Sequence, residues 1–337
     1  MKRNSLIGSV LAGALFLVGC PKPPQPTSQP TQTPTSVVKK NPLPDELAPP
    51  PSWYDLGPKT AAPAATEAIL ERGRGLFLEK CAVCHGDSGG GDGPYANQTP
   101  FLPRDFRQGI FKIRSTPAGS LPTDADLFRT ITRGVPGGGM PGMLELSEEE
   151  KWALVRYTQE LTVADEADER RDPIPIPEPT AQDAAAAARG RAVYLLLDCR
   201  NCHGTKGDAT GLRSKDLLDD WGKPIKVTNL TLPWPYKGGS TPRDLYRTLV
   251  AGLDGSPMPP YDTDARFLFA KKDFASNWQD AFSRDLSKDA LTEIKTFIDA
   301  LPESTPKTEA DKKKMAEGYR YDLIAYIRAN FPRKVKE

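Results

Sequence analysis

The sequence has few of the residues on which most metal and thiol chemistry depends. Its 337 residues include two histidines and five cysteines. Two histidines are too few for a multi-histidine metal centre, or for two haems that each have histidine on both faces, so much metalloenzyme chemistry is excluded. A net charge of one sign is also missing, because 45 Lys and Arg residues balance 44 Asp and Glu residues. Such a chain has no general field that would attract nucleic acid, and we expect no nucleic-acid partner.

The first twenty residues have the pattern of an export signal. A basic start, Met1–Arg3, precedes the apolar run Leu6–Val18, which is too short to span a bilayer. The run ends just before Cys20, and the whole resembles a bacterial lipoprotein signal, in which 1–19 is removed and Cys20 is acylated. The alternative is a plain secretory signal with an incidental cysteine. The resemblance implies a lipid anchor on the periplasmic side of a bacterial membrane, and Pro21 in place of Asp favours the outer membrane.

Two proline-rich stretches divide the rest of the chain. Residues 20–63 contain thirteen prolines and few apolar side chains. Such a stretch cannot offset its ordering entropy by burial, so it predicts an extended tether. Residues 164–182 include an Ile-Pro-Ile-Pro-Glu-Pro run, which is typical of a stiff polyproline II linker. Two folded domains are therefore predicted, over 64–163 and 183–337.

An internal repeat relates these two regions. The C-x-x-C-H motif at Cys81–His85 recurs 118 residues later at Cys199–His203. A Met-Pro pair recurs at the same offset, with the methionines at Met140 and Met258. A constant offset over separated motifs predicts a duplicated domain. Helical spacing of apolar residues around both copies and weak strand signals predict an all-α protein with two tandem domains.

Helices are expected over 66–80, 147–161, 181–198 and 315–329. The second region has an insertion, about 262–314, between its methionine and its last helix. Its aromatic residues predict a helical cover with a small core of its own, and the alternative is a docking surface for a redox partner.

The repeated C-x-x-C-H motif is the attachment signature of c-type haem. Two thiols on one helical turn can add to the two vinyl groups of one porphyrin, and the histidine that follows can bind the iron. A thioredoxin-like dithiol would not explain the histidine, and a zinc site of four cysteines would need pairs much closer in sequence. Two covalently bound haems are predicted, with attachment at Cys81, Cys84, Cys199 and Cys202 and iron ligands His85 and His203.

With these motifs the chain resembles the class I cytochrome c family. In that family a helix with a glycine and an aromatic residue precedes the motif, as Gly73 and Phe77 do here, and Gly190 with Tyr194 keeps the same spacing. A methionine far downstream is the sixth iron ligand in the family. The resemblance implies the axial pairs His85/Met140 and His203/Met258. Elimination agrees, since no histidine remains and each of these methionines lies 59 residues after the first cysteine of its motif; the rival in the first domain is Met143.

The family resemblance also implies that the carbonyl of Pro103 would accept a hydrogen bond from His85. The internal repeat singles out two further residues. Arg129 and Arg247, which recur with Asp126 and Asp244 three residues earlier, would either hold haem propionates or form ion pairs on a helix surface.

Methionine opposite histidine leaves no open position on the iron and favours its reduced state, which suits one-electron transfer. The sequence therefore predicts a membrane-anchored periplasmic di-haem cytochrome that passes electrons between redox proteins and is not itself an enzyme. The alternative is a cytochrome subunit of a larger respiratory or oxidoreductase complex. A di-haem peroxidase-like enzyme or a haem sensor would need one of the methionines not to be a ligand.

Overall fold

A computed structural model describes residues 52–99, 101–162, 171–282 and 285–331. Within these ranges the chain is helical and contains no β-strand, which confirms the predicted all-α fold. None of the helices in the described ranges is long and apolar enough to cross a membrane. The predicted lipoprotein signal, 1–19, and Cys20 lie outside the described residues.

The first half of the chain, which corresponds to the predicted domain 64–163, is built on two crossing helices, α1 (Glu67–Lys80) and α4 (Glu148–Leu161). The second half corresponds to the predicted domain 183–337. The helices cross closely at Gly73, where an added Cβ would lie 2.2 Å from the carbonyl oxygen of Ala153. The rings of Phe77 and Tyr157 pack beside this point, with centroids 5.3 Å apart. Gly73 and Phe77, the glycine and aromatic residue that match the family pattern, therefore lie at the crossing of these two helices. The shorter elements of this half are α2 (Ala82–His85), α3 (Asp124–Arg133), η2 (Ala96–Gln98) and η3 (Phe106–Gln108).

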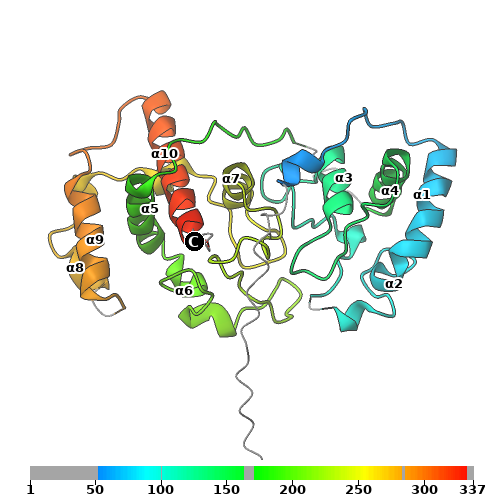
Figure 1. The fold of residues 1–337 in the computed structure, drawn as a ribbon, viewed down its shortest axis with the longest axis horizontal. Helices are drawn as coiled ribbons and strands as arrows, with labels where there is room; N and C mark the ends of the chain where they lie inside the picture. Colours follow the sequence, from blue (N-terminus) through cyan, green and yellow to red (C-terminus); the bar gives the residue numbers. More distant parts are fainter. Residues whose placement is uncertain (1–51, 100, 163–170, 283–284, 332–337) are drawn as a thin grey trace, which may run out of the picture. The chain divides into compact units, whose positions relative to one another are not determined.

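The second half repeats this arrangement with α5 (Ala184–Leu196) and α10 (Glu309–Ala329), which lie against one another in Figure 1. At their crossing an added Cβ on Gly190 would lie 1.8 Å from the carbonyl oxygen of Asp322. Helix α10 begins six residues before the expected start at 315. The remaining repeat elements are α6 (Arg200–His203), η4 (Leu212–Lys215) and α7 (Pro242–Ala251).

The insertion of the second half forms η5 (Asp264–Phe267), η6 (Lys271–Asp273), α8 (Trp278–Phe282) and α9 (Lys288–Asp299). Phe267 and Ile294 are fully buried in the same apolar cluster as Val193 and Tyr194 of α5. The prediction of a separate small core is therefore wrong. The insertion instead extends the core of the second half.

A short 3₁₀ helix, η1 (Trp53–Leu56), packs on helices of both halves, between α3 and α7 (Figure 1). Trp53 is fully buried, and the guanidinium groups of Arg129 and Arg247 lie 5.0 and 4.1 Å from its ring centroid. Such cation–π contacts favour the buried ring. Residues 52–63 fall within the predicted tether, yet this end of it is packed on the helices that carry the repeat.

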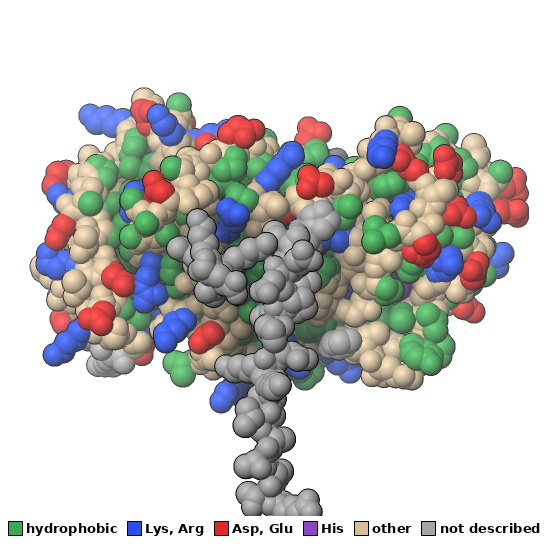
Figure 2. Space-filling view, in the orientation of Figure 1, with side chains coloured by type: hydrophobic (Ala, Val, Ile, Leu, Met, Phe, Trp, Pro, Cys, Tyr) green, Lys and Arg blue, Asp and Glu red, His purple; other side chains and the backbone are tan. Residues whose placement is uncertain are grey.

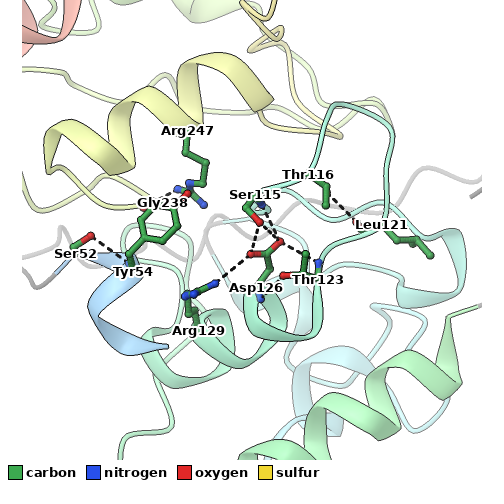
Figure 3. Close-up of polar contacts among 10 residues, drawn as sticks. All are labelled: Ser52, Tyr54, Ser115, Thr116, Leu121, Thr123, Asp126, Arg129, Gly238 and Arg247. Atoms are coloured by element: carbon green, nitrogen blue, oxygen red, sulfur yellow. Dashed lines mark hydrogen bonds and ion pairs between the residues drawn. The ribbon is translucent and has the colours of Figure 1, made fainter. Parts of the chain in front are cut away.

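The repeated aspartates of α3 and α7 have different partners. Asp126 accepts hydrogen bonds from the backbone N and Oγ of Ser115, both at 2.8 Å (Figure 3). Asp244 accepts them instead from Ser52 Oγ and Trp53 N, at 2.8 and 3.1 Å. Ser52 and Trp53 at the start of η1 therefore bind the aspartate of α7 in the second half, as the loop residue Ser115 binds the aspartate of α3 in the first half.

Arg129 and Arg247 point to Trp53 and are not among the residues that line the cavities described below. Arg129 Nη1 lies 3.5 Å from Asp126, and Arg247 Nη2 donates to the carbonyl oxygen of Gly238 at 2.7 Å (Figure 3). The structure thus gives no support to the alternative in which these arginines hold haem propionates. Of the two arginines, only Arg129 forms the predicted ion pair with the aspartate three residues earlier. Both arginines contact Trp53, where the two halves meet.

The two halves belong to one compact unit, and several further hydrogen bonds join them. The buried guanidinium of Arg114 pairs with Asp254 at 2.8 Å and donates to the carbonyl oxygen of Ala251 at 3.0 Å. Arg133 Nη1 donates to the carbonyl oxygen of Lys237 at 2.8 Å. On the surface, Lys/Arg and Asp/Glu side chains are interspersed over the face drawn in Figure 2, outside the grey atoms. This face therefore presents no strong field of one sign.

Candidate functional site

Each C-x-x-C-H motif faces an apolar cavity. Cys81, Cys84, His85 and Met140 all line the first cavity, which has a volume of about 240 Å³. The second cavity, of about 90 Å³, is lined by Cys199, His203 and Met258. Cys202 lies on α6 but is not among the residues that line this cavity. The structure thus brings seven of the eight predicted haem residues to two cavities.

The motif places its three side chains together because it forms a single helical turn. In the first half the backbone N of His85 donates to the carbonyl oxygen of Cys81 at 2.9 Å, so the two cysteines and the histidine occupy positions i, i+3 and i+4. Side chains at this spacing share one helix face. The turn ends at Gly86, whose φ of 74° is in the left-handed region. The second motif ends in the same way at Gly204, with φ 81°.

Both histidines are held through the nitrogen that does not face the iron in a haem protein. His85 Nδ1 lies 3.1 Å from the carbonyl oxygen of Arg104, and His203 Nδ1 lies 3.0 Å from that of Thr228. A carbonyl oxygen can only accept, so Nδ1 carries the proton and Nε2 keeps its lone pair for a metal. Burial lowers the pKa of both rings, against a smaller opposing effect of these hydrogen bonds. Both histidines are thus held neutral.

The carbonyl that accepts from His85 is not the expected one. The prediction of Pro103 is wrong by one residue, since Arg104 provides the oxygen. The carbonyl of Pro103 points instead to the loop after the motif, where a Cβ on Gly91 would lie 2.6 Å from it.

The two predicted methionine ligands sit in matching loops. The backbone N of Val135 donates to the carbonyl oxygen of Met140 at 2.9 Å, and Leu253 N donates to that of Met258 at 3.2 Å. The same hydrogen bond thus recurs at the repeat offset. Met143 also lines the first cavity, and it packs on the apolar cluster of α1 and α4. The backbone bond of Met143, to the carbonyl oxygen of Ile131 at 3.0 Å, also recurs in the second half, from Tyr261 N to that of Leu249 at 2.8 Å. The repeat favours Met140 because its counterpart, Met258, is a methionine, whereas the counterpart of Met143 is Tyr261.

The cysteines do not suit the two alternative chemistries. Burial raises the pKa of Cys81 to about 11 and that of Cys199 to about 12. A redox-active dithiol needs a lowered pKa, so the thioredoxin-like alternative is not supported. The two cysteine pairs also line different cavities, and no group of three or more His, Cys, Asp or Glu within the described ranges could hold a metal ion. A zinc site of four cysteines is therefore excluded for these residues.

Polar groups in the wall of the first cavity were not predicted from the sequence. Lys112 and Lys237 both line it, and Thr130 Oγ1 is buried there without a hydrogen-bond partner in the described part of the chain. Lys237 belongs to the second half, so no motif near Cys81 could have indicated it. A haem has apolar faces and two anionic propionates. An apolar cavity with thiols, a neutral histidine, a thioether and cations in its wall has the donor set that this group requires.

Two comparisons with known proteins found similar proteins. Residues 68–157 match the family model of cytochrome c oxidase, cbb3-type, subunit III. A solved chain of the Kuenenia stuttgartiensis reducing HAO-like protein complex Kustc0457/Kustc0458 superimposes with a TM-score of 0.60 at 28% identity, covering 81% of this chain and 100% of that chain. Among curated proteins, none matches this sequence.

The family match supports a c-type cytochrome family for this chain. A match to that family implies a covalently bound c-type haem, and it supports a role in electron transfer.

Proposed function

We propose that this protein is a di-haem c-type cytochrome, anchored by Cys20 to the periplasmic side of a bacterial membrane, that relays single electrons between redox proteins. The axial pairs are His85/Met140 and His203/Met258. Each iron is closed by its methionine, so the protein transfers electrons and does no substrate chemistry of its own.

One observation carries this proposal. The backbone hydrogen bond from Val135 N to the carbonyl oxygen of Met140, at 2.9 Å, recurs from Leu253 N to the carbonyl oxygen of Met258, at 3.2 Å. Each methionine lines the same cavity as the histidine of its own motif. Two equivalent sites are what a tandem pair of haem domains requires.

The test is the absorption spectrum of the purified, haem-loaded protein in its oxidised, reduced and carbon monoxide-treated reduced forms. We expect two haems per chain by haem and protein assay, a methionine–iron charge-transfer band, and no change with carbon monoxide. Carbon monoxide binding to one haem would mean an open iron and would favour the peroxidase-like or sensor alternatives. One haem per chain would overturn the di-haem assignment.

The anchor has a separate test. In a bacterial host that acylates lipoproteins, radiolabelled palmitate is expected to label the wild-type chain, and the Cys20→Ala variant is expected to carry no label. Fractionation of the two membranes then distinguishes outer from inner membrane, and Pro21 favours the outer. Labelling that persists in Cys20→Ala would contradict the anchor.

A second candidate function is that of a cytochrome subunit within a larger redox complex. It is favoured by the likeness to a chain of the reducing HAO-like protein complex, which extends over 81% of this chain. Purification at micromolar dilution separates the two candidates, because a subunit retains a stoichiometric partner and a free carrier elutes alone.

A further inference from the structure

The wall of the first cavity that faces the second half carries an excess of positive charge. Arg104, Lys112 and Lys237 all line the cavity, and Lys237 is 9% exposed. Among the described residues, no carboxylate lies within 4 Å of the ammonium of Lys112 or of Lys237. The ring of Phe101, which also lines the cavity, lies 6.0 Å from Lys112 Nζ and 4.8 Å from Lys237 Nζ. Both cations thus flank one ring at the cavity wall.

Buried cations without a counterion are costly, so this cluster indicates an anion that belongs there. Burial, together with the neighbouring charges of Arg104 and Lys237, lowers the pKa of Lys112 to about 7, against a smaller opposing effect of Asp219 and Asp220. Burial also lowers the pKa of Lys237, with Arg104 as the second cause. The three charges therefore repel one another within one small region.

Asp219, the carboxylate in the wall of this cavity, offsets part of the positive charge and, with Asp220, raises the pKa of Lys112 and of Arg104, but among the described residues it forms no ion pair with either lysine. Asp219 Oδ1 accepts hydrogen bonds from the backbone N of Trp221 at 3.1 Å and of Lys223 at 2.9 Å, which fixes it in a turn. The fourth cation, Lys80, lies 3.2 Å from Glu79. Arg104 donates to the carbonyl oxygens of Asp254 and Gly255.

The cations would suit the polar edge of a haem. Thioethers to Cys81 and Cys84 would fix the vinyl edge of a porphyrin at α2, and the two propionates belong to the other edge of the ring. Lys112 and Lys237 line the same cavity as these cysteines, and Lys237 comes from the second half of the chain. The same side chain also lines the second cavity.

We propose that Lys112, together with Lys237 from the second half, neutralises the propionates of the first haem, so that the second half completes the first haem site and helps to set its reduction potential. This inference rests on the proposed function, because it requires a haem at Cys81 and Cys84. A nearby positive charge disfavours the more positive ferric iron, and the lysines therefore raise the potential of the first haem.

The test is a spectroelectrochemical titration of the full-length, haem-loaded protein, with the two haems assigned by the Met140→Ala variant. In Lys237→Gln and in Lys112→Gln we expect the midpoint potential of the first haem to fall. We expect Lys237→Arg, which keeps the charge, to restore it. The propionate bending bands in the resonance Raman spectrum should shift in both glutamine variants. Lys295→Gln, which removes an exposed lysine paired with Asp299, is the matched control and should leave the potentials and bands unchanged.

Two results would overturn the inference. The first is an unchanged midpoint of the first haem in both glutamine variants, with haem loaded normally. The second is a shift in midpoint potential confined to the second haem, which would mean that Lys237 acts only on the haem of the second cavity. A wild-type chain that carries no covalent haem would instead defeat the proposed function. Lys112→Gln alone still tests the inference if Lys237→Gln does not fold.

Discussion

At the scale of the residue, the choice between two methionines decides the chemistry of the haem proposed for the first cavity. Met140→Ala is expected to remove the methionine–iron charge-transfer band of one haem, to lower its midpoint potential and to allow carbon monoxide to bind, because loss of the thioether opens the iron. Met143→Ala is the matched control, since it removes a thioether from the same cavity. Absorption spectra and redox titrations of both variants provide the measurement, and loss of the band in Met143→Ala would exchange the two assignments.

The histidines show which parts of the site are local in sequence. Each attachment motif lies on one turn, so Cys81, Cys84 and His85 could be grouped from their spacing alone. The carbonyl partner of His85 depends on how a loop nineteen residues away approaches it, and there the prediction missed by one residue. Lys237 had no local signal, because it reaches the first cavity from the other half.

At the scale of the element, the helix crossings depend on glycine. Gly73→Ala is expected to destabilise the haem-loaded protein by roughly 1–3 kcal/mol, because its Cβ would overlap the backbone of α4. Gly75→Ala is the control on the same helix. It has no atom within 4 Å of its Cβ position, and alanine there should stabilise α1 by roughly 0.5–1 kcal/mol. Urea unfolding followed by circular dichroism measures both, and equal effects would contradict the crossing.

The second half offers an independent version of this comparison. Gly190→Ala would put a Cβ 1.8 Å from the carbonyl oxygen of Asp322, whereas Gly318→Ala on α10 meets nothing within 4 Å. We expect Gly190→Ala to lower the yield of haem-loaded protein or its unfolding midpoint, and Gly318→Ala to leave both unchanged or improved. An unaffected Gly190→Ala would mean that the two helices can separate at no cost.

The helices themselves could be predicted well because their signals are local. Caps and apolar spacing fixed α1 and α4 to within a residue of their expected ends. The insertion was harder, because its aromatic residues do not reveal which core they join. Phe267 belongs to the same apolar core as Val193, a residue more than seventy positions earlier, and no pattern in the insertion indicates that core.

At the scale of the whole molecule, Trp53 holds the halves together. Trp53→Ala is expected to cost about 3–5 kcal/mol, as for other buried tryptophans, and to separate the unfolding of the two halves into two transitions. Trp278→Ala, a partly buried tryptophan of the insertion, is the control and should keep one transition. Calorimetry of the haem-loaded variants measures this, and a single unshifted transition in Trp53→Ala would show that the other bonds between the halves suffice.

The sequence analysis missed this residue because it treated 20–63 as one tether. The available signal was the Ser-Trp-Tyr-Asp segment at its end. Two adjacent aromatic residues in a capping box are unusual in a chain that buries nothing. Their partners, Arg129 and Arg247, belong to the two copies of the repeat and could not be assigned without the fold.

The anchorage of Ser52 and Trp53 also determines how a mechanical load enters the protein. A pull on the chain from before Ser52 acts first on the two hydrogen bonds to Asp244 and on the ring held between Arg129 and Arg247. These contacts reach both copies of the repeat, so the halves resist the pull together. Helix α1 takes the load only after η1 detaches. Tension is therefore taken up at the junction, and the geometry of either proposed haem site is unaffected until the junction separates.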